Sequence, residues 1–297
     1  MWIKEDGKLK YKKHYVTSTG GQCLMSPPEI TDGKMPYALY LLGGCLFNIA
    51  FSVIFLGLYL FFRNVPYFSA FLLYLSVCGF AFALLNGVPM RRGMIDNDGY
   101  STLALGKNDK ALWAFWVQLK VTGQLAQGVR LKDMPEEWFF VPLPEEMNNS
   151  IVATIGVLAC NRLMDKHSFM EADQLMDNYL TKDSAIVGLH RHFLVCDRIY
   201  CELIAGNRQD RLIEMLDKQQ KKFMKSMKNS PSVQRTKYSY MLLAKKNIKK
   251  ADKIKEQFEK RSRSYPYPSD IVSELELIGI ADCISEKGAI DVLSRIN

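Results

Sequence analysis

Residues 37–90 read YALYLLGGCLFNIAFSVIFLGLYLFFRNVPYFSAFLLYLSVCGFAFALLNGVPM, and this stretch decides the fold class. It holds two runs without a charged residue, Tyr37–Phe62 and Tyr67–Met90, separated only by Arg63-Asn64-Val65-Pro66. An α-helix rises about 1.5 Å per residue, so about 20 apolar residues cross a hydrocarbon core of about 30 Å. Each run is long enough to span a membrane, and the short connection predicts an antiparallel transmembrane hairpin. Two buried helices of a soluble protein are the alternative.

The composition describes a chain with two contrasting parts. Its 297 residues have a mean hydropathy of −0.08, which averages the apolar stretch with a strongly basic second half. This length is enough for one large domain or two smaller ones. The seven cysteines are odd in number and are never spaced C-x-x-C, which argues against a disulfide framework and a structural zinc knuckle.

Basic residues flank the hairpin and set its predicted orientation. Six lysines precede it, Arg91, Arg92 and Lys107 follow it, and the turn carries only Arg63. Because short loops rich in Lys and Arg stay on the cytoplasmic side, both ends of the chain are predicted to be cytoplasmic. The predicted protein is a multi-pass protein of the cell membrane, with residues 36–105 as its transmembrane unit.

The segment before the hairpin, residues 1–35, is predicted to be a short cytoplasmic β element. Residues 2–11 alternate in polarity around Asp6-Gly7, a pattern typical of a β-hairpin with a type I′ turn. Gly20-Gly21 follows and leads into an extended segment that enters the first apolar run.

Two motifs stand out in the hairpin and just after it. In the first run, Gly43-Gly44 and Asn48 predict close packing between helices, because small residues and amides favour helix contacts in membranes. The second run stops at Asn86-Gly87-Val88-Pro89, and Asp96-Asn97-Asp98-Gly99 follows. Carboxylates at a membrane boundary are costly unless they face water or have a function. A proline helix stop followed by a tight turn explains the same residues.

Taken in order, these features resemble the site-2 protease family of intramembrane zinc metallopeptidases. In that family an H-E-x-x-H helix precedes a β segment with a Gly-Gly pair, a helix with a G-P-x-x-N-like motif, and a helix ending in N-x-x-P before a D-G pair. Gly20-Gly21 resembles the second element and Gly44–Asn48 the third, with Cys45 in place of the proline. Asn86–Pro89 with Asp98-Gly99 resembles the fourth, so the likeness covers about residues 1–105.

The resemblance implies peptide-bond hydrolysis in a membrane-embedded protein substrate, with Zn²⁺ as cofactor. In such sites two His and a carboxylate hold the metal, and a Glu acts as general base. Carried over to this chain, Asp98 is the expected metal ligand, with Asp96 as the alternative acid. Asn86, Gly20 and Gly21 are the expected substrate-side residues.

The chain departs from the family in a way that leaves its site incomplete. It holds no H-E-x-x-H, and its four histidines are His14, His167, His190 and His192. Two accounts fit: a chain that lacks an upstream helix carrying the two His and the general base, which we favour, or a pseudoenzyme that lost it. The rival function is a non-catalytic, membrane-anchored adaptor.

Residues 106–149 are predicted to form a juxtamembrane helix and a linker. The helix, Asp109–Leu125, carries Trp113, Phe115 and Trp116, and several prolines mark the segment after it. Aromatic residues just beyond a bilayer either lie in its interface or dock on the next domain, and we expect docking.

Residues 150–297 show continuous helical periodicity and a repeated mark. Leu163-Met164, Leu203-Ile204 and Leu242-Leu243 recur after 40 and 39 residues. Each stands nine residues before a small or apolar residue, namely Ala172, Leu212 and Ala251. The pattern resembles a tetratricopeptide-like array, whose concave face binds a peptide or protein partner. The predicted fold class is therefore mainly α: a β element, a transmembrane hairpin and a cytoplasmic helical-repeat domain.

Basic residues are concentrated in this second half. Between Asn207 and Arg263 there are 18 Lys and Arg against 6 Asp and Glu, a net charge of +12. Attraction to anionic lipid and plain solvated helix surfaces are both open interpretations. Nucleic-acid binding is not expected, because no recognisable nucleic-acid module is present.

Overall fold

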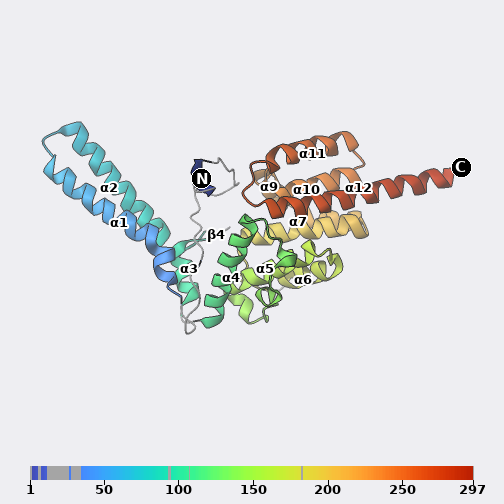
Figure 1. The fold of residues 1–297 in the computed structure, drawn as a ribbon, viewed down its shortest axis with the longest axis horizontal. Helices are drawn as coiled ribbons and strands as arrows, with labels where there is room; N and C mark the ends of the chain where they lie inside the picture. Colours follow the sequence, from blue (N-terminus) through green and yellow to red (C-terminus); the bar gives the residue numbers. More distant parts are fainter. Residues whose placement is uncertain are drawn as a thin grey trace.

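The computed structural model of the chain describes residues 2–5, 8–11, 27, 35–92, 95–106, 108–181 and 183–296. These residues form twelve α-helices and two small two-stranded sheets, so the described chain is mainly helical, as predicted (Figure 1). A two-helix arm projects from one side of a helical body, and the end of the last helix projects from the other (Figure 1).

The first sheet pairs β1 (Trp2–Glu5) with β2 (Lys8–Tyr11) in antiparallel register, with Glu5 opposite Lys8. This register confirms the predicted strand pairing. The type I′ turn predicted at Asp6-Gly7 lies outside the described residues, as do Gly20, Gly21 and His14.

The arm consists of α1 (Tyr37–Phe61) and α2 (Pro66–Gly87), which pack along each other. Pro66 stands at the first position of α2, where its missing N–H leaves no helical hydrogen bond unmade. Both helices are long and apolar enough to span a membrane. Their large side chains point outward: Leu39 is 70% exposed and Phe61 is 78% exposed.

The contact between α1 and α2 uses small and polar residues. Ser76 Oγ donates a hydrogen bond of 2.8 Å to the Ser52 carbonyl, and a Cβ added at Gly79 would lie 2.2 Å from Ser52 Oγ. The close packing predicted at Gly43-Gly44 is not made between α1 and α2, because a Cβ added at either glycine would meet no atom of another described element within 4 Å. The tight contact lies instead at Gly79 of α2, which faces Ser52 and the Asn48 carbonyl of α1.

A short corner joins the arm to the body. It contains the second sheet, β3 (Arg91–Arg92) with β4 (Ile95–Asp96), and then α3 (Asp98–Leu105). The next helix, α4 (Asp109–Ala126), matches the predicted juxtamembrane helix, and the Asn108 side chain caps it by accepting a hydrogen bond from the Ala111 N–H.

The aromatic residues of α4 dock on neighbouring protein. Trp113 packs against Phe140, and Trp116 packs edge-on against Trp138. Phe115 is buried in a hydrophobic cluster that also includes Ile155 of α5 (Ser150–Asp165) and the base of α1. The cluster therefore extends across two predicted segment boundaries, the one after residue 105 and the one after residue 149.

The body continues through three short 3-10 turns and seven more α-helices beyond α5. The turns are η1 (Leu131–Asp133), η2 (Glu136–Phe139) and η3 (Glu146–Asn148). The helices are α5 (Ser150–Asp165), α6 (Phe169–Thr181), α7 (Gly188–Ala205), α8 (Gln209–Met215), α9 (Lys218–Ser226), α10 (Pro231–Ser239), α11 (Ile248–Ser262) and α12 (Pro268–Ile296), with a π-helical turn η4 (Tyr240–Ala244) after α10.

Three turns in the body each contain one non-glycine residue with a left-handed backbone. The residue that turns the chain between α5 and α6 is His167, with φ of 61°, and Asn207 (48°) and Lys246 (49°) occupy the turns before α8 and α11. These left-handed residues recur after 40 and 39 residues, the same interval as the sequence marks. Ala172, Leu212 and Ala251 are all buried on the helix that follows the turn.

Candidate functional site

Asn97 organises the corner where α2 ends and α3 begins. Its Oδ1 accepts hydrogen bonds from the N–H groups of Met90 (3.0 Å) and Tyr100 (2.9 Å). Its Nδ2 donates to the carbonyls of Leu85 (2.9 Å) and Val88 (2.6 Å). One side chain therefore caps α3 and satisfies carbonyls that the end of α2 leaves open. The sequence interpretation treated Asn97 only as part of a turn.

Two glycines allow the corner to close tightly. A Cβ added at Gly99 would lie 2.2 Å from the Gly87 carbonyl oxygen and 3.0 Å from the Pro89 nitrogen, both backbone atoms. On its other side Gly87 faces α1, where a Cβ would lie 3.5 Å from the Cys45 sulfur. The structure thus brings together Cys45 of the first-run motif with Gly87 and Gly99, which both belong to the motif that follows the second run.

Asp98 begins α3 beside this contact and is partly buried. Burial raises the pKa of its carboxyl above the ordinary value. Its side chain forms no ion pair with any of the described residues. Asn86, the predicted substrate-side amide, lies on the last turn of α2 with its side chain exposed.

Asp96, the alternative acid, is engaged in holding the corner against the body. Its Oδ1 pairs with Arg91 Nε at 3.1 Å, and Arg91 Nη2 donates to the Ala185 carbonyl at 3.0 Å, just before α7. The Asp96 side chain is only 10% exposed. Of the two acids, Asp98 is the one that the described structure leaves unpaired.

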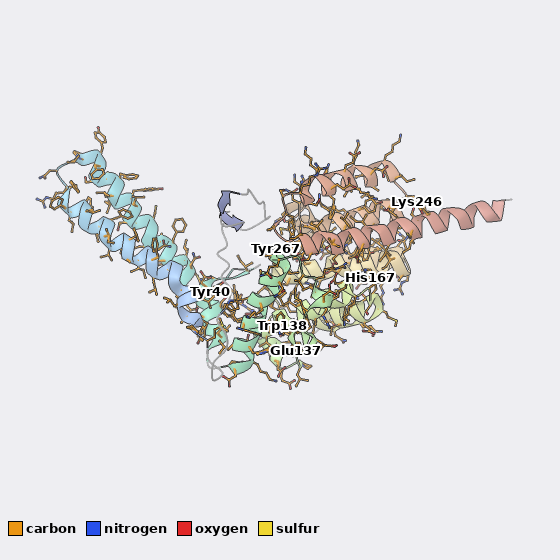
Figure 2. The ribbon with its side chains drawn as sticks, viewed as in Figure 1. Tyr40, Glu137, Trp138, His167, Lys246 and Tyr267 are labelled. Carbon is orange, nitrogen blue, oxygen red and sulfur yellow. The ribbon has the colours of Figure 1, made fainter. Side chains whose placement is uncertain are left out.

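The corner alone does not make a zinc site. Among the described residues, no group of three or more His, Cys, Asp or Glu side chains is placed to hold a metal ion. His167 lies in the helical body, well away from Tyr40 at the base of the arm (Figure 2). Asp98 is therefore one donor without the rest of a coordination shell.

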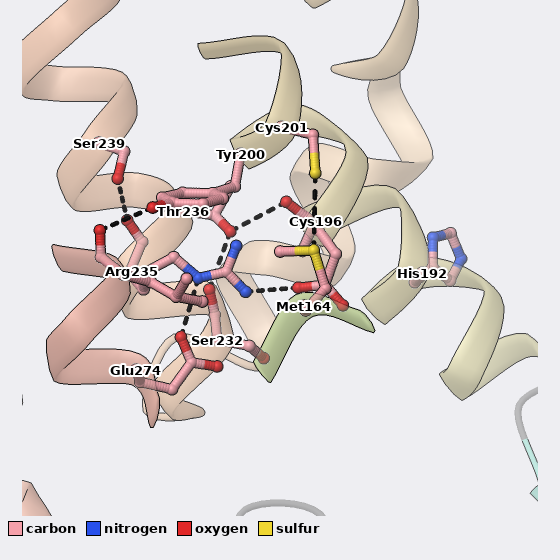
Figure 3. Close-up of polar contacts among 12 residues, drawn as sticks. Met164, His192, Cys196, Tyr200, Cys201, Ser232, Arg235, Thr236, Ser239 and Glu274 are labelled. Atoms are coloured by element: carbon pink, nitrogen blue, oxygen red, sulfur yellow. Dashed lines mark hydrogen bonds and ion pairs between the residues drawn. The ribbon is translucent and has the colours of Figure 1, made fainter. Parts of the chain in front are cut away.

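A second polar site, which sequence reasoning missed, lies inside the helical body around Arg235. This side chain is 1% exposed; its Nε donates to Glu274 Oε2 at 2.8 Å and its Nη2 pairs with Asp197 (Figure 3). Its guanidinium carbon lies 4.6 Å from the centre of the Tyr200 ring. Arg235 belongs to the basic stretch that suggested a solvated or lipid-facing surface, and no sequence signal separates it from its exposed neighbours.

A neighbouring network ties the α4–α5 connection to α12. Arg130 Nη2 pairs with Asp165 Oδ1 at 2.6 Å and also binds Glu276 Oε2 at 2.8 Å. Burial opposes ionisation of Asp165, but hydrogen bonds from Arg130 and Ser273 keep the pKa of this carboxyl below its ordinary value. These buried charges are matched by partners, as the free energy of burying them requires.

Comparison of the chain with protein-family models, with curated proteins and with solved structures finds no match.

Proposed function

We propose that this chain is part of a site-2-protease-like intramembrane zinc metallopeptidase, with Asp98 as its carboxylate ligand. In this proposal α1 and α2 cross the cell membrane, both ends of the chain are cytoplasmic, and the substrate is a membrane-embedded protein. The single observation that carries it is the contact of Gly99 with Gly87 beside Cys45, which brings two of the family-like motifs, Gly44–Asn48 and Asn86–Pro89 with Asp98-Gly99, to one corner.

The state of the two acids supports the choice of Asp98. Asp96 is committed to Arg91, whereas the partly buried Asp98 has a raised pKa and no described cation beside it. A carboxylate in that position gains from a nearby positive charge. The two histidines and the general base must come from outside the described residues, so we derive no catalytic step through zinc.

The first test is the reading frame upstream of Met1. The proposal predicts an in-frame apolar helix that bears H-E-x-x-H. A stop codon immediately before Met1 would contradict it.

The second test compares cleavage by two variants of the protein expressed from its natural gene. Asp98→Asn should abolish cleavage of a membrane-embedded substrate while leaving membrane insertion intact. Asp96→Asn is the matched control and should retain cleavage. Full cleavage by Asp98→Asn would remove the proposed role.

The second candidate is a non-catalytic, membrane-anchored adaptor whose body binds a cytoplasmic peptide or protein. The left-handed turns at His167, Asn207 and Lys246 favour it, because a recurring helix-pair geometry is what a tetratricopeptide-like array requires. A protein from the natural gene that has no upstream H-E-x-x-H and binds no zinc would favour this adaptor.

A further inference from the structure

A pocket of about 330 Å³ opens between α5, α7, α10 and the start of α12, beside the Arg235 network. It is larger than the room that one or two buried waters occupy. Its wall combines apolar side chains, such as Leu158, Phe193 and Leu277, with charged and hydroxyl groups. Apolar surface and many hydrogen-bonding groups therefore face the same space, which suits a small molecule that has both an apolar group and polar groups.

The charges that line the pocket do not balance. Four carboxylates, those of Asp165, Asp197, Asp270 and Glu274, face two arginines, Arg130 and Arg235. Asp270 forms no ion pair or hydrogen bond with any described residue, and burial followed by the nearby Glu274 and Asp165 raises its pKa to about 7. Both arginines already have carboxylate partners, so Asp270 is the carboxyl left for a ligand, and a bound cation would favour its ionised form.

Two buried nitrogens at the pocket lack partners among the described residues. One is Nη1 of Arg235, which carries no dashed line in Figure 3, and the other is Nδ1 of His190. A buried guanidinium N–H without an acceptor costs free energy, so the ligand that satisfies it carries an acceptor oxygen. This observation is independent of the acidic excess.

We propose that this pocket binds a small molecule with an ammonium group, an adjacent acceptor oxygen and an apolar side group. The ammonium lies near Asp270, the oxygen accepts from Arg235 Nη1, and the side group packs on the apolar wall. This pattern is that of a hydrophobic amino acid or of the N-terminal residue of a peptide. The proposal goes beyond the function proposed above and does not depend on it.

The test is titration calorimetry of the full chain in detergent micelles or nanodiscs with L-leucinamide. Saturable binding is expected for L-leucinamide. N-acetyl-L-leucinamide, which lacks the ammonium, and isopentylamine, which lacks the acceptor, should each bind at least tenfold more weakly. Free L-leucine distinguishes the two possible ligands. Binding as tight as that of L-leucinamide indicates a free amino acid, and much weaker binding indicates a peptide N-terminus.

The variant Asp270→Asn should weaken binding of L-leucinamide at least tenfold. Asp210→Asn is the matched control, because Asp210 also stands in the first turn of a helix but is exposed, and it should bind like the unmodified chain. An unchanged or raised thermal midpoint of the free Asp270→Asn protein shows that it is folded. No saturable binding to the unmodified chain, or equal binding by Asp270→Asn, overturns the proposal.

Discussion

The arm and the body bury opposite kinds of side chain. In α1 the buried residues are Cys45 and Ser52, and the large apolar side chains face outward. In the body, Arg235 is 1% exposed and its two carboxylate partners are held inside. Large apolar side chains that face outward, with small residues left for the helix contact, are the pattern of a lipid-exposed helix pair and support the proposed membrane span. The body instead buries charged groups in matched pairs.

This contrast shows where each region is sensitive to substitution. In the arm, apolar character is set by composition, and only the few contact positions are sterically demanding. In the body, the sensitive positions are polar groups whose removal leaves a buried partner without compensation. The predictions below test this difference, from the largest expected effect to the smallest.

Arg235→Ala should have the largest effect. It leaves Asp197 and Glu274 buried without their cation, and breaking a buried ion pair in this way costs about 3–5 kcal/mol. Chemical unfolding followed by circular dichroism measures the loss. Arg211→Ala, an exposed control nearby, should change stability by less than about 0.5 kcal/mol. A loss below about 1 kcal/mol for Arg235→Ala would show that the network is not stabilising.

Gly99→Ala should destabilise the corner by about 1–3 kcal/mol, because its methyl group would press on backbone atoms of Gly87 that cannot move aside. Gly43→Ala is the control in the arm, where no described atom lies within 4 Å of the new methyl group. That change should be neutral or stabilising by up to about 1 kcal/mol, since Ala is the better helix former. Thermal unfolding in micelles ranks the two variants, and the reverse order would refute the tight corner.

The ionisation of Asp270 should make stability depend on pH. Its pKa is raised to about 7 in the folded chain, first by burial and then by Glu274 and Asp165, against 3.8 as its ordinary value. Both states hold the proton below pH 3.8, so no penalty exists there. As pH rises from about 4 to about 7 the unfolded state loses its proton first, and the stability of the folded state falls.

The comparison variant for this pH effect is Asp270→Asn, which does not ionise. The free energy of unfolding of Asp270→Asn should equal that of the unmodified chain at about pH 4. At about pH 7.5 it should be higher by at least about 1 kcal/mol. Unfolding midpoints across this range measure it. If the difference in stability between the two proteins is the same at every pH, the Asp270 carboxyl is well solvated in the folded chain.

The smallest effect concerns the basic residues between Asn207 and Arg263, and it decides between the two open interpretations, attraction to anionic lipid and plain solvation. Lys249 and Lys250 at the start of α11 are exposed. The electrostatic attraction between an exposed lysine and a nearby anionic membrane surface is about 1 kcal/mol. Chemical acylation of these two lysines should be severalfold slower in nanodiscs with anionic lipid than in nanodiscs with neutral lipid. Salt near 1 M shortens the Debye length to about 3 Å and should remove this difference. Lys166, which is exposed in the turn before α6, is the control. Equal rates in anionic and neutral lipid would leave these lysines simply solvated.

The sequence predicted what composition and local signals determine. Uncharged runs and a proline located α1 and α2 almost to the residue, and Asp109 was correctly predicted to start α4. The contacts that make the sites were not predictable in this way. Gly79, rather than Gly43, meets Ser52, and Arg235 is buried although its lysine neighbours are exposed, because both facts depend on helices far apart in the chain. The choice between Asp96 and Asp98 likewise depended on Arg91 and the body that it contacts.

The zinc content of the protein expressed from its natural gene tests the proposed role of Asp98 most directly. Metal analysis of the membrane-purified protein should find about one zinc per chain, as a single structural or catalytic site requires. Asp98→Asn should lose most of it, and Asp96→Asn should keep it. Zinc retained in full by Asp98→Asn, or no zinc in the unmodified protein, would contradict the account.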